Sequence, residues 1–322
     1  MLRLWLACFI LVSCIFFSYS KSNKLNLVMG TTISAFSPNS DECHEYVLDV
    51  FVDVDKRISE WKSSSPISKL NEFGYLEFKT KNEFLKDSLK ASFEIAEMTD
   101  GAFDPTWAAL WGLWDFESEK IPSDESLQSA LDLIDWKHVE LNNNHCKFLK
   151  PGMKIGLGAI GKGIALDKCK EVLHSSNIEN YIIVAGGQVL VSGLNNGKKW
   201  RVGIRKPDGL RNELAYVLDL TNTCISTSGD YEKYFEKDGI RYHHIINPKT
   251  GMPARGTKSV TVITPNATLA DALSTAFFVM GPTESIKFAN RFPNLDVIII
   301  DSDLKHHLSN GVEKNIFLKL ED

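Results

Sequence analysis

Helix-like and strand-like segments follow one another irregularly along this chain, and their order limits the fold more than any other feature. Apolar residues recur at helical spacing in 40–61 and 82–98, so both are predicted helices. After residue 139 most segments read as short strands, and 161–174 and 268–279 read as helices. Because there is no regular βαβ rhythm, an α+β fold is favoured over a doubly wound parallel sheet.

The other predicted elements are short. Residues 25–36 alternate loosely and read as one strand, and Ser123 begins a short helix with Glu125 in its first turn. The remaining predicted strands are 181–185, 200–204, 215–220, 240–246, 259–263, 297–300 and 316–320. No linker is long enough to separate two independent domains, so 25–322 is expected to form one domain.

The N-terminus has the pattern of an export signal. Arg3 precedes an almost unbroken apolar run from residue 4 to residue 17. Such a run is short for a membrane span and typical of a secretory signal, so 1–20 is a predicted signal peptide. An uncleaved anchor is the alternative.

The site of cleavage is open between two alternatives. Residues 11–14 (LVSC) resemble a bacterial lipobox, in which Cys14 is lipidated and becomes the new N-terminus. Ordinary cleavage after 18–20 (SYS) is the other alternative, since small residues stand at suitable positions there. We therefore expect an exported protein at the periplasmic face of a bacterial inner membrane, anchored by lipid if Cys14 is modified.

Composition argues against several classes of protein. Apolar residues make up 43% of the 322 residues and charged residues 24%, as in ordinary globular proteins. The net charge of −5 and the lack of a Lys/Arg run give no reason to expect a nucleic-acid partner.

The four cysteines after the leader are widely spaced without a CxxC pair, so a zinc site is not expected; they are Cys43, Cys146, Cys169 and Cys224. Buried free thiols are favoured over disulfides.

A glycine-rich segment, 156–163 (GLGAIGKG), precedes the predicted helix 161–174 and resembles two nucleotide-binding motifs. The P-loop needs a hydroxyl after its lysine, and Gly163 follows Lys162 here. The dinucleotide motif needs an acidic residue after the next strand, and 185–187 (AGG) has none. The free N–H groups of such a turn and the positive helix end still suit a pyrophosphate. A close crossing of a helix and a strand is the alternative.

Three further segments carry polar groups, each with an ordinary structural alternative. Residues 227–231 (TSGDY) offer hydroxyls after an apolar strand, or form a capped turn. Residues 243–251 (HHIINPKTG) combine two imidazoles with a turn, although a histidine there is more often a surface residue. Asp104 stands before a proline that holds its backbone extended.

One carboxylate lies in an otherwise apolar predicted helix. Asp271 is followed one turn later, on the same face, by Thr275. A carboxylate on a buried face is unfavourable unless it is paired or bound to a metal, and these oxygens suit a hard cation such as Mg²⁺. A local hydrogen bond or helix cap is the alternative.

As an ordered set, these segments resemble the FAD:protein FMN transferases, the ApbE-type flavin transferases. The resemblance extends from about residue 27 to the C-terminus. It rests on 29–31 (MGT), 59–61 (SEW) with Ser68, Leu70 and Asn71, 101–104 (GAFD), 158–163, 185–187, 200–207 (WRVGIRKP), 227–230, 244–251 and 270–275 (ADALST). It implies an α+β, T-fold-like domain with mixed sheets and flanking helices, and an FAD cleft between two lobes.

The resemblance also implies the residues of the site. Those implied to bind FAD are Met29, Trp61, Ala102, Phe103, Asp104, Gly156, Lys162, Ser228, His244 and Ile245. A metal is implied on the backbone carbonyl of Ala159 and the side chains of Asp271 and Thr275. His244 is the implied catalytic base. Many relatives have Asp where this chain has Gly156, and Ser274 replaces an acid found in some.

The implied activity is transfer of the FMN part of FAD to a threonine hydroxyl of an acceptor flavoprotein, with release of AMP and with one or two Mg²⁺ ions. The implied acceptor is a subunit of a membrane electron-transfer complex. Two alternatives stay open: an FAD pyrophosphatase of the same fold, which yields FMN and AMP without an acceptor, and a flavin-binding lipoprotein without catalytic activity.

Overall fold

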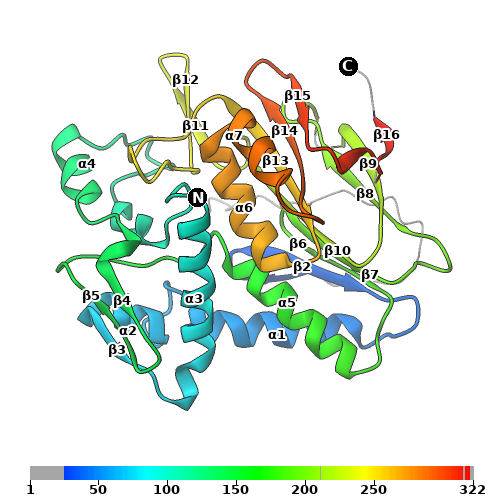
Figure 1. Ribbon diagram of the computed structural model, residues 1–322, viewed down its shortest axis with the longest axis horizontal. Coiled ribbons are helices and arrows are strands. Elements are labelled where there is room, and N and C mark those ends of the chain that lie inside the picture. Colours follow the sequence, from blue (N-terminus) through cyan, green and yellow to red (C-terminus); the bar gives the residue numbers. More distant parts are fainter. Residues whose placement is uncertain (1–24, 211, 315, 320–322) are drawn as a thin grey trace, which may run out of the picture.

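An eight-stranded sheet organises the chain in the computed structural model, which describes residues 25–210, 212–314 and 316–319 (Figure 1). In spatial order its strands are β1 (Asn26–Val28), β2 (Thr31–Phe36), β6 (Tyr181–Ala185), β7 (Gln188–Ser192), β10 (Thr223–Gly229), β13 (Thr257–Thr264), β14 (Asp296–Asp301) and β15 (His306–Leu308). Every strand pairing in these ranges is antiparallel. The predicted signal peptide and Cys14 lie outside the described residues.

Both faces of this sheet are buried. Helices α1 (Cys43–Ile58), α5 (Gly161–Ser175) and α6 (Ala267–Met280) pack on one face (Figure 1). A second sheet packs on the other face and consists of β16 (Ile316–Lys319), β9 (Leu214–Leu220) and β8 (Trp200–Arg205). Successive side chains of a strand point to opposite faces. In β14, for example, Ile299 joins the core beneath the helices and Ile298 the core beneath the second sheet.

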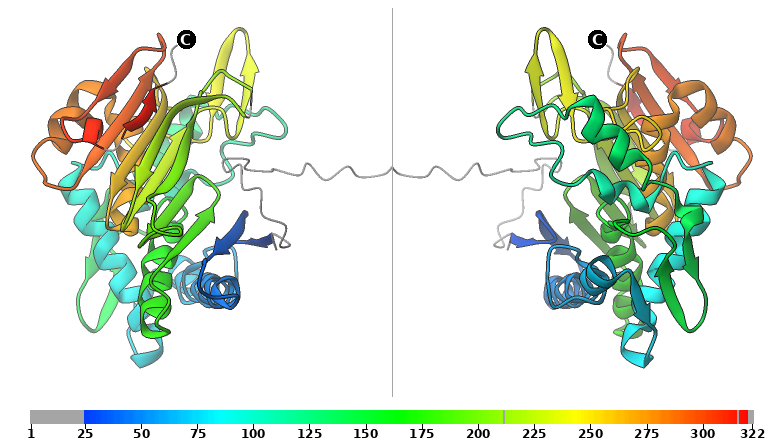
Figure 2. Two further views of the ribbon diagram at one scale, coloured as in Figure 1. Left: turned by 90° about the vertical axis from the view of Figure 1, so that its right-hand side faces the viewer. Right: turned by 90° about the vertical axis from the view of Figure 1, so that its left-hand side faces the viewer.

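The remaining elements flank this three-layered body. They are α2 (Pro66–Phe73), α3 (Glu83–Met98), α4 (Asp124–Leu131), α7 (Pro282–Ala289), a sheet of β3 (Tyr75–Glu77), β5 (His145–Phe148) and β4 (Val139–Leu141), and a hairpin of β11 (Tyr234–Lys237) and β12 (Ile240–His243). Short 3₁₀ turns are Thr80–Asn82, Pro105–Leu110, Trp136–His138 and Val312–Lys314. The hairpin projects from one end of the molecule (Figure 2).

The predicted α+β fold is confirmed, and so are the four long helices, with ends shifted by up to three residues. The prediction of one strand over 25–36 is wrong, because Met29 and Gly30 both have positive φ (51° and 69°) and turn the chain between β1 and β2. Such a two-residue turn joins antiparallel strands and matches their twist. The sequence also did not reveal α2 and α7, which have only eight residues each, so that each apolar face consists of few residues.

The cysteine prediction is confirmed, since Cys43, Cys146, Cys169 and Cys224 are free and buried. Burial raises the pKa of Cys43 and of Cys146 to about 12. Both thiols therefore stay protonated and unreactive at neutral pH. Within the described ranges, no helix has the length and apolar character that crossing a membrane requires.

The crossing of α5 and α6 positions the end of the glycine-rich segment. A Cβ added to Gly163 would lie 2.4 Å from the backbone oxygen of Ala267 and 2.8 Å from Cβ of Asp271. Beside this contact, the Asp167 carboxylate of α5 accepts hydrogen bonds from Ala267 N (3.0 Å) and Thr268 N (2.8 Å) at the start of α6. Gly163 thus allows two helices to pack closely, whereas the alternative expected from the sequence was a close crossing of a helix and a strand.

We expect Gly163→Ala to destabilise the fold by about 1–3 kcal/mol, because the added methyl group meets backbone atoms that cannot move independently. Gly161→Ala is the matched control, since its Cβ would meet the flexible end of Met29 at 3.1 Å. Free energies of unfolding in urea provide the comparison. Equal stability of the two variants would contradict the crossing described here.

Candidate active site

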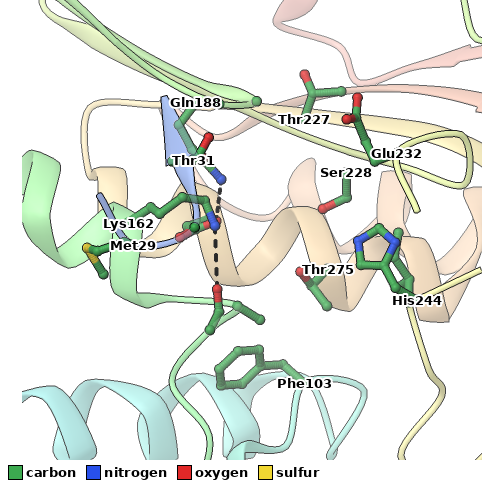
Figure 3. A pocket seen from close by; sticks show the side chains of 18 of the residues that line it. Met29, Thr31, Phe103, Lys162, Gln188, Thr227, Ser228, Glu232, His244 and Thr275 are labelled. Carbon is green, nitrogen blue, oxygen red and sulfur yellow. Dashed lines mark hydrogen bonds and ion pairs between the residues drawn. The ribbon is translucent and has the colours of Figure 1, made fainter. Parts of the chain in front are cut away.

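A cavity of about 570 Å³ opens between these layers, and its size is typical of small-molecule sites. Segments far apart in the sequence line it, including the β1–β2 turn, the glycine-rich turn, β8 and α6. The predicted site residues that line the cavity are Met29, Trp61, Ala102, Phe103, Asp104, Ala159, Lys162, Ser228, His244, Ile245, Asp271 and Thr275. Gly156 does not line the cavity and lies next to Trp107, which does. Lys162 and Gln188 lie at one end, and Ser228 and His244 toward the other (Figure 3).

Asp271 occupies the end of the cavity near Lys162. Its side chain belongs to apolar α6 and the residue is only 3% exposed. Oδ2 accepts a hydrogen bond from Gly163 N (2.9 Å), and Oδ1 accepts one from Gln188 Nε2 (2.6 Å). Lys162 Nζ lies 4.0 Å from Oδ1. The carboxylate is thus paired as a buried charge must be, and each oxygen keeps acceptor capacity.

A serine network extends from Asp271 toward the middle of the cavity. Ser274 Oγ donates to the Asp271 backbone carbonyl (2.8 Å). Because this uses its only proton, Ser274 accepts from Ser226 Oγ (3.1 Å) and Ser228 Oγ (2.8 Å). Ser226 in turn accepts from Gln188 Nε2 (3.3 Å). Ser274, where some relatives have an acid, therefore serves as a hydrogen-bond junction here.

The glycine-rich turn supplies positive charge and free backbone groups at the same end. Lys162 Nζ donates to the Gly158 carbonyl (3.4 Å), and α5 begins directly beside it at Gly161. Helix N-termini and such turns favour anions. Burial raises the pKa of the neighbouring Glu60 carboxyl, while hydrogen bonds from backbone groups, including those of Leu157 and Gly158, oppose the rise. A cavity with this end suits a phosphate-bearing ligand.

The two adjacent histidines have different surroundings. His243 is buried, its Nε2 donates to the Ala254 carbonyl (2.8 Å), and burial lowers the pKa of His243 to about 4.

His244 lies in the cavity, where its Nδ1 donates to the Lys233 carbonyl (3.2 Å). A carbonyl only accepts, so Nδ1 carries the proton and Nε2 of the neutral ring is the acceptor. Desolvation lowers the pKa of His244, the hydrogen bond to the Lys233 carbonyl opposes this, and the charges of Lys162 and Lys233 lower the pKa further. His244 is therefore a neutral base at neutral pH.

Met29 reaches the cavity from a strained turn. Its φ of 51° is rare for a residue other than glycine, asparagine or aspartate. Strained backbone of this kind persists where the surrounding structure holds it, often at functional sites. Met29 lines the cavity near Lys162 (Figure 3), and the methyl end of its side chain lies beside Gly161 at the start of α5.

Two tryptophans, Trp61 and Trp107, line one side of the cavity, and a third, Trp111, contacts both. Trp61 is 73% exposed and its ring lies 5.0 Å from that of Trp111, which meets Trp107 edge to face at 6.1 Å. A Cβ added to Gly156 would lie only 2.8 Å from Trp111 Cζ2 and 3.4 Å from Trp107 Nε1. The glycine at this position thus leaves room for the indole rings.

Asp104 differs from the other predicted FAD contacts. It lines the cavity, but Oδ1 accepts from Thr106 N (2.8 Å) and Thr106 Oγ1 (2.6 Å), and Oδ2 accepts from Trp136 N (3.1 Å). Burial raises the pKa of Asp104 and these hydrogen bonds oppose the rise. Both carboxylate oxygens therefore connect protein segments, in addition to any contact with a ligand.

The predicted metal ligands come together in a set of suitable chemistry. Ala159, Asp271 and Thr275 line the same cavity and offer a carbonyl, a carboxylate and a hydroxyl oxygen, the donors that Mg²⁺ prefers. Among the described residues, no three His, Cys, Asp or Glu side chains gather into a metal-binding group. A cation here would therefore depend on Asp271 for its charged ligand, and these residues fit that requirement.

Comparison with known proteins identifies the family, because residues 29–299 match the model of the ApbE family. This chain belongs to the ApbE family. A Treponema pallidum protein named FAD:protein FMN transferase is 31% identical over 315 residues, which cover 90% of this chain and 87% of that protein. The FAD:protein FMN transferase of Escherichia coli K12 is 33% identical over 278 residues, which cover 82% and 79%.

Solved structures of ApbE proteins share the fold. The ApbE protein of Thermotoga maritima matches with a TM-score of 0.81 at 32% identity, and the flavin transferase ApbE of Vibrio cholerae with 0.80 at 28%. Each match covers 91% of this chain and 98% of the other. The eight-stranded sheet and its flanking layers are thus an ApbE-family fold.

Some cavity residues of this ApbE-family chain were missed by sequence reasoning, among them Trp107, Gln188 and Glu232. Gln188 is a polar residue at the start of an apolar strand, directly after Gly186 and Gly187. That contrast is a signal that could have found it. Trp107 and Glu232 stand in segments where aromatic and charged residues are common, so no local signal marks them.

We expect Gly156→Asp to destabilise the protein by about 1–3 kcal/mol, because its side chain would displace the Trp111 ring. Trp111→Val in the same chain should restore most of the stability by making room. Thermal unfolding of the two single variants and the double variant measures this coupling. Additive effects of the two substitutions would show that the rings do not exclude an aspartate.

Proposed function

We propose that this chain transfers FMN from FAD to a threonine hydroxyl of an acceptor protein with the help of Mg²⁺, and releases AMP. Its full-length relatives bear the name FAD:protein FMN transferase. The observation that carries the proposal is one cavity with an Asp271–Lys162 pair at one end and a neutral histidine toward the other. Phosphoryl transfer needs these two kinds of group, charge stabilisation and a base.

The cavity residues divide the work of binding FAD. Met29, Phe103 and the exposed Trp61 offer apolar and aromatic surface for a flavin ring. Lys162 and the turn N–H groups suit the pyrophosphate. Mg²⁺ on the Ala159 carbonyl, Asp271 and Thr275 would neutralise charge on the phosphate oxygens when bound.

His244 is the proposed base. The threonine oxygen attacks the phosphorus on the riboflavin side, and a new P–O bond forms as the bond to the AMP oxygen breaks. Nε2 of His244 takes the hydroxyl proton, and its Nδ1–H···O=C bond to Lys233 holds the ring and stabilises the resulting imidazolium. The product is FMN linked to threonine as a phosphoester.

Location and acceptor are further parts of the proposal. The apolar leader 4–17 supports export, and 11–14 supports lipid attachment at Cys14. We therefore place the enzyme at the periplasmic face of the inner membrane. The acceptor is then a flavoprotein subunit of a membrane electron-transfer complex.

Asp271→Asn should lower metal-dependent flavinylation about 100-fold or more, because a cation at such a site is worth several kcal/mol of transition-state stabilisation. The amide keeps the size of the side chain and its bond from Gly163. In-gel flavin fluorescence of an acceptor domain incubated with FAD and Mg²⁺ measures transfer, and AMP release together with free FMN measures hydrolysis. Asp303→Ala, on an exposed turn, is the control.

Unchanged transfer in Asp271→Asn would contradict the metal assignment. Release of FMN and AMP without labelling of any acceptor would instead favour the pyrophosphatase.

His244→Gln should lower the rate about 10²–10⁴-fold, the usual contribution of a general base. In the native enzyme, kcat/KM should fall on acidification as His244 gains a proton, at a pH below the ordinary histidine pKa because desolvation in the cavity lowers this pKa. His244→Gln should lack this decline. His174→Gln, an exposed histidine of α5, is the control, and an unchanged pH profile in His244→Gln would argue against the base.

A further inference from the structure

Gln188 is a buried amide whose hydrogen bonds are incompletely satisfied. It begins β7, lines the cavity and is only 4% exposed. Nε2 donates one hydrogen to Asp271 Oδ1 (2.6 Å) and the other to Ser226 Oγ (3.3 Å). Oε1 is buried and has no hydrogen-bond partner.

Chemistry fixes the orientation of this amide. An ionised carboxylate only accepts hydrogen bonds, so the NH₂ group of Gln188 must face Asp271 and Oε1 must face away. Buried side-chain acceptors in folded proteins are nearly always paired, and an unpaired one is unfavourable. The hydrogen bond from Gln188 Nε2 to Asp271 is thus made although it leaves Oε1 of Gln188 without a partner.

The amide also closes a ring of hydrogen bonds around Asp271. From Gln188 the ring passes through Ser226 and Ser274 to the Asp271 backbone carbonyl, and it returns through the Asp271 side chain. Gln188 thus holds the Asp271 carboxylate from β7, and through the two serines it is also connected to the backbone of α6. In metal sites, partners of this kind orient the ligand and tune the affinity for the cation.

We propose that Gln188 is a positioning residue for the cation: the hydrogen bond from its Nε2 holds Oδ1 of Asp271 in the orientation that binds the metal. The inference deepens the proposed function and depends on a divalent cation at Asp271. Gln188 is thus expected to strengthen the binding of the metal without contributing to the binding of FAD itself.

The test is direct cation binding to the full chain. Mn²⁺ titration followed by electron paramagnetic resonance gives the dissociation constant, with and without FAD. Gln188→Leu removes the amide, and Gln188→Met removes it while keeping the length of the side chain. Gln128→Leu is the matched control, because Gln128 also donates to a carboxylate, Asp132 (3.3 Å), but on the exposed surface of α4.

Both Gln188 variants should bind Mn²⁺ about 10- to 100-fold more weakly than the native chain. Both variants should stay folded at the temperature of the titration, with a lower melting temperature because Asp271 Oδ1 loses a hydrogen-bond donor. Their dissociation constants for FAD alone should change little. The Mg²⁺ concentration at half-maximal rate should rise more than kcat falls. The Gln128 variant should match the native chain in every measurement.

Two outcomes would overturn the role of Gln188. One is native Mn²⁺ affinity in both Gln188 variants while Asp271→Asn loses binding. The other is unfolding of both Gln188 variants without metal, because a positioning role leaves the fold intact. If the native chain itself binds no Mn²⁺, or if Asp271→Asn binds it equally well, the cation site of the proposed function fails instead.

Discussion

The rest of the site depends on how one buried carboxylate is satisfied. Asp271 stands in apolar α6, where an unpaired charge would be strongly unfavourable. Its partners come from two other elements, Gly163 N at the start of α5 and Gln188 at the start of β7. Gly163 N can donate to Asp271 only because α5 and α6 lie so close together at this point that a residue larger than glycine would not fit. The same approach brings Lys162 and the glycine-rich turn to the cavity.

Periodicity was a good guide to the long elements and a poor one to turns and order. The helices α1 and α3 have clear apolar faces and α6 is largely apolar, so their segments were predicted correctly. The turn at Met29 and Gly30 escaped detection because methionine rarely adopts a positive φ. The strand order β7-β10-β13 joins segments far apart in sequence, and local patterns contain no information about such pairings.

The site shows the same division. Asp271, Thr275, Lys162 and His244 could be found because their residue types are unusual for their surroundings or match a family motif, and the structure brings them to one cavity. Gln188 could not be assigned a partner, because Asp271 is 83 positions away. Gly156 was implied to bind FAD, whereas in the structure it is not among the residues that line the cavity, and Trp107 and Trp111 pack against it. Sequence indicated several of the cavity residues, and only the packing showed their partners.

In the proposed mechanism, Asp271 and Thr275 hold a divalent cation beside the pyrophosphate of FAD. Anomalous scattering from crystals of the protein with FAD and Mn²⁺ tests it most directly. We predict one strong peak within bonding distance of Asp271, Thr275 and the Ala159 carbonyl, in contact with phosphate oxygens. Bound FAD with no manganese at Asp271, or with manganese only elsewhere, would contradict it.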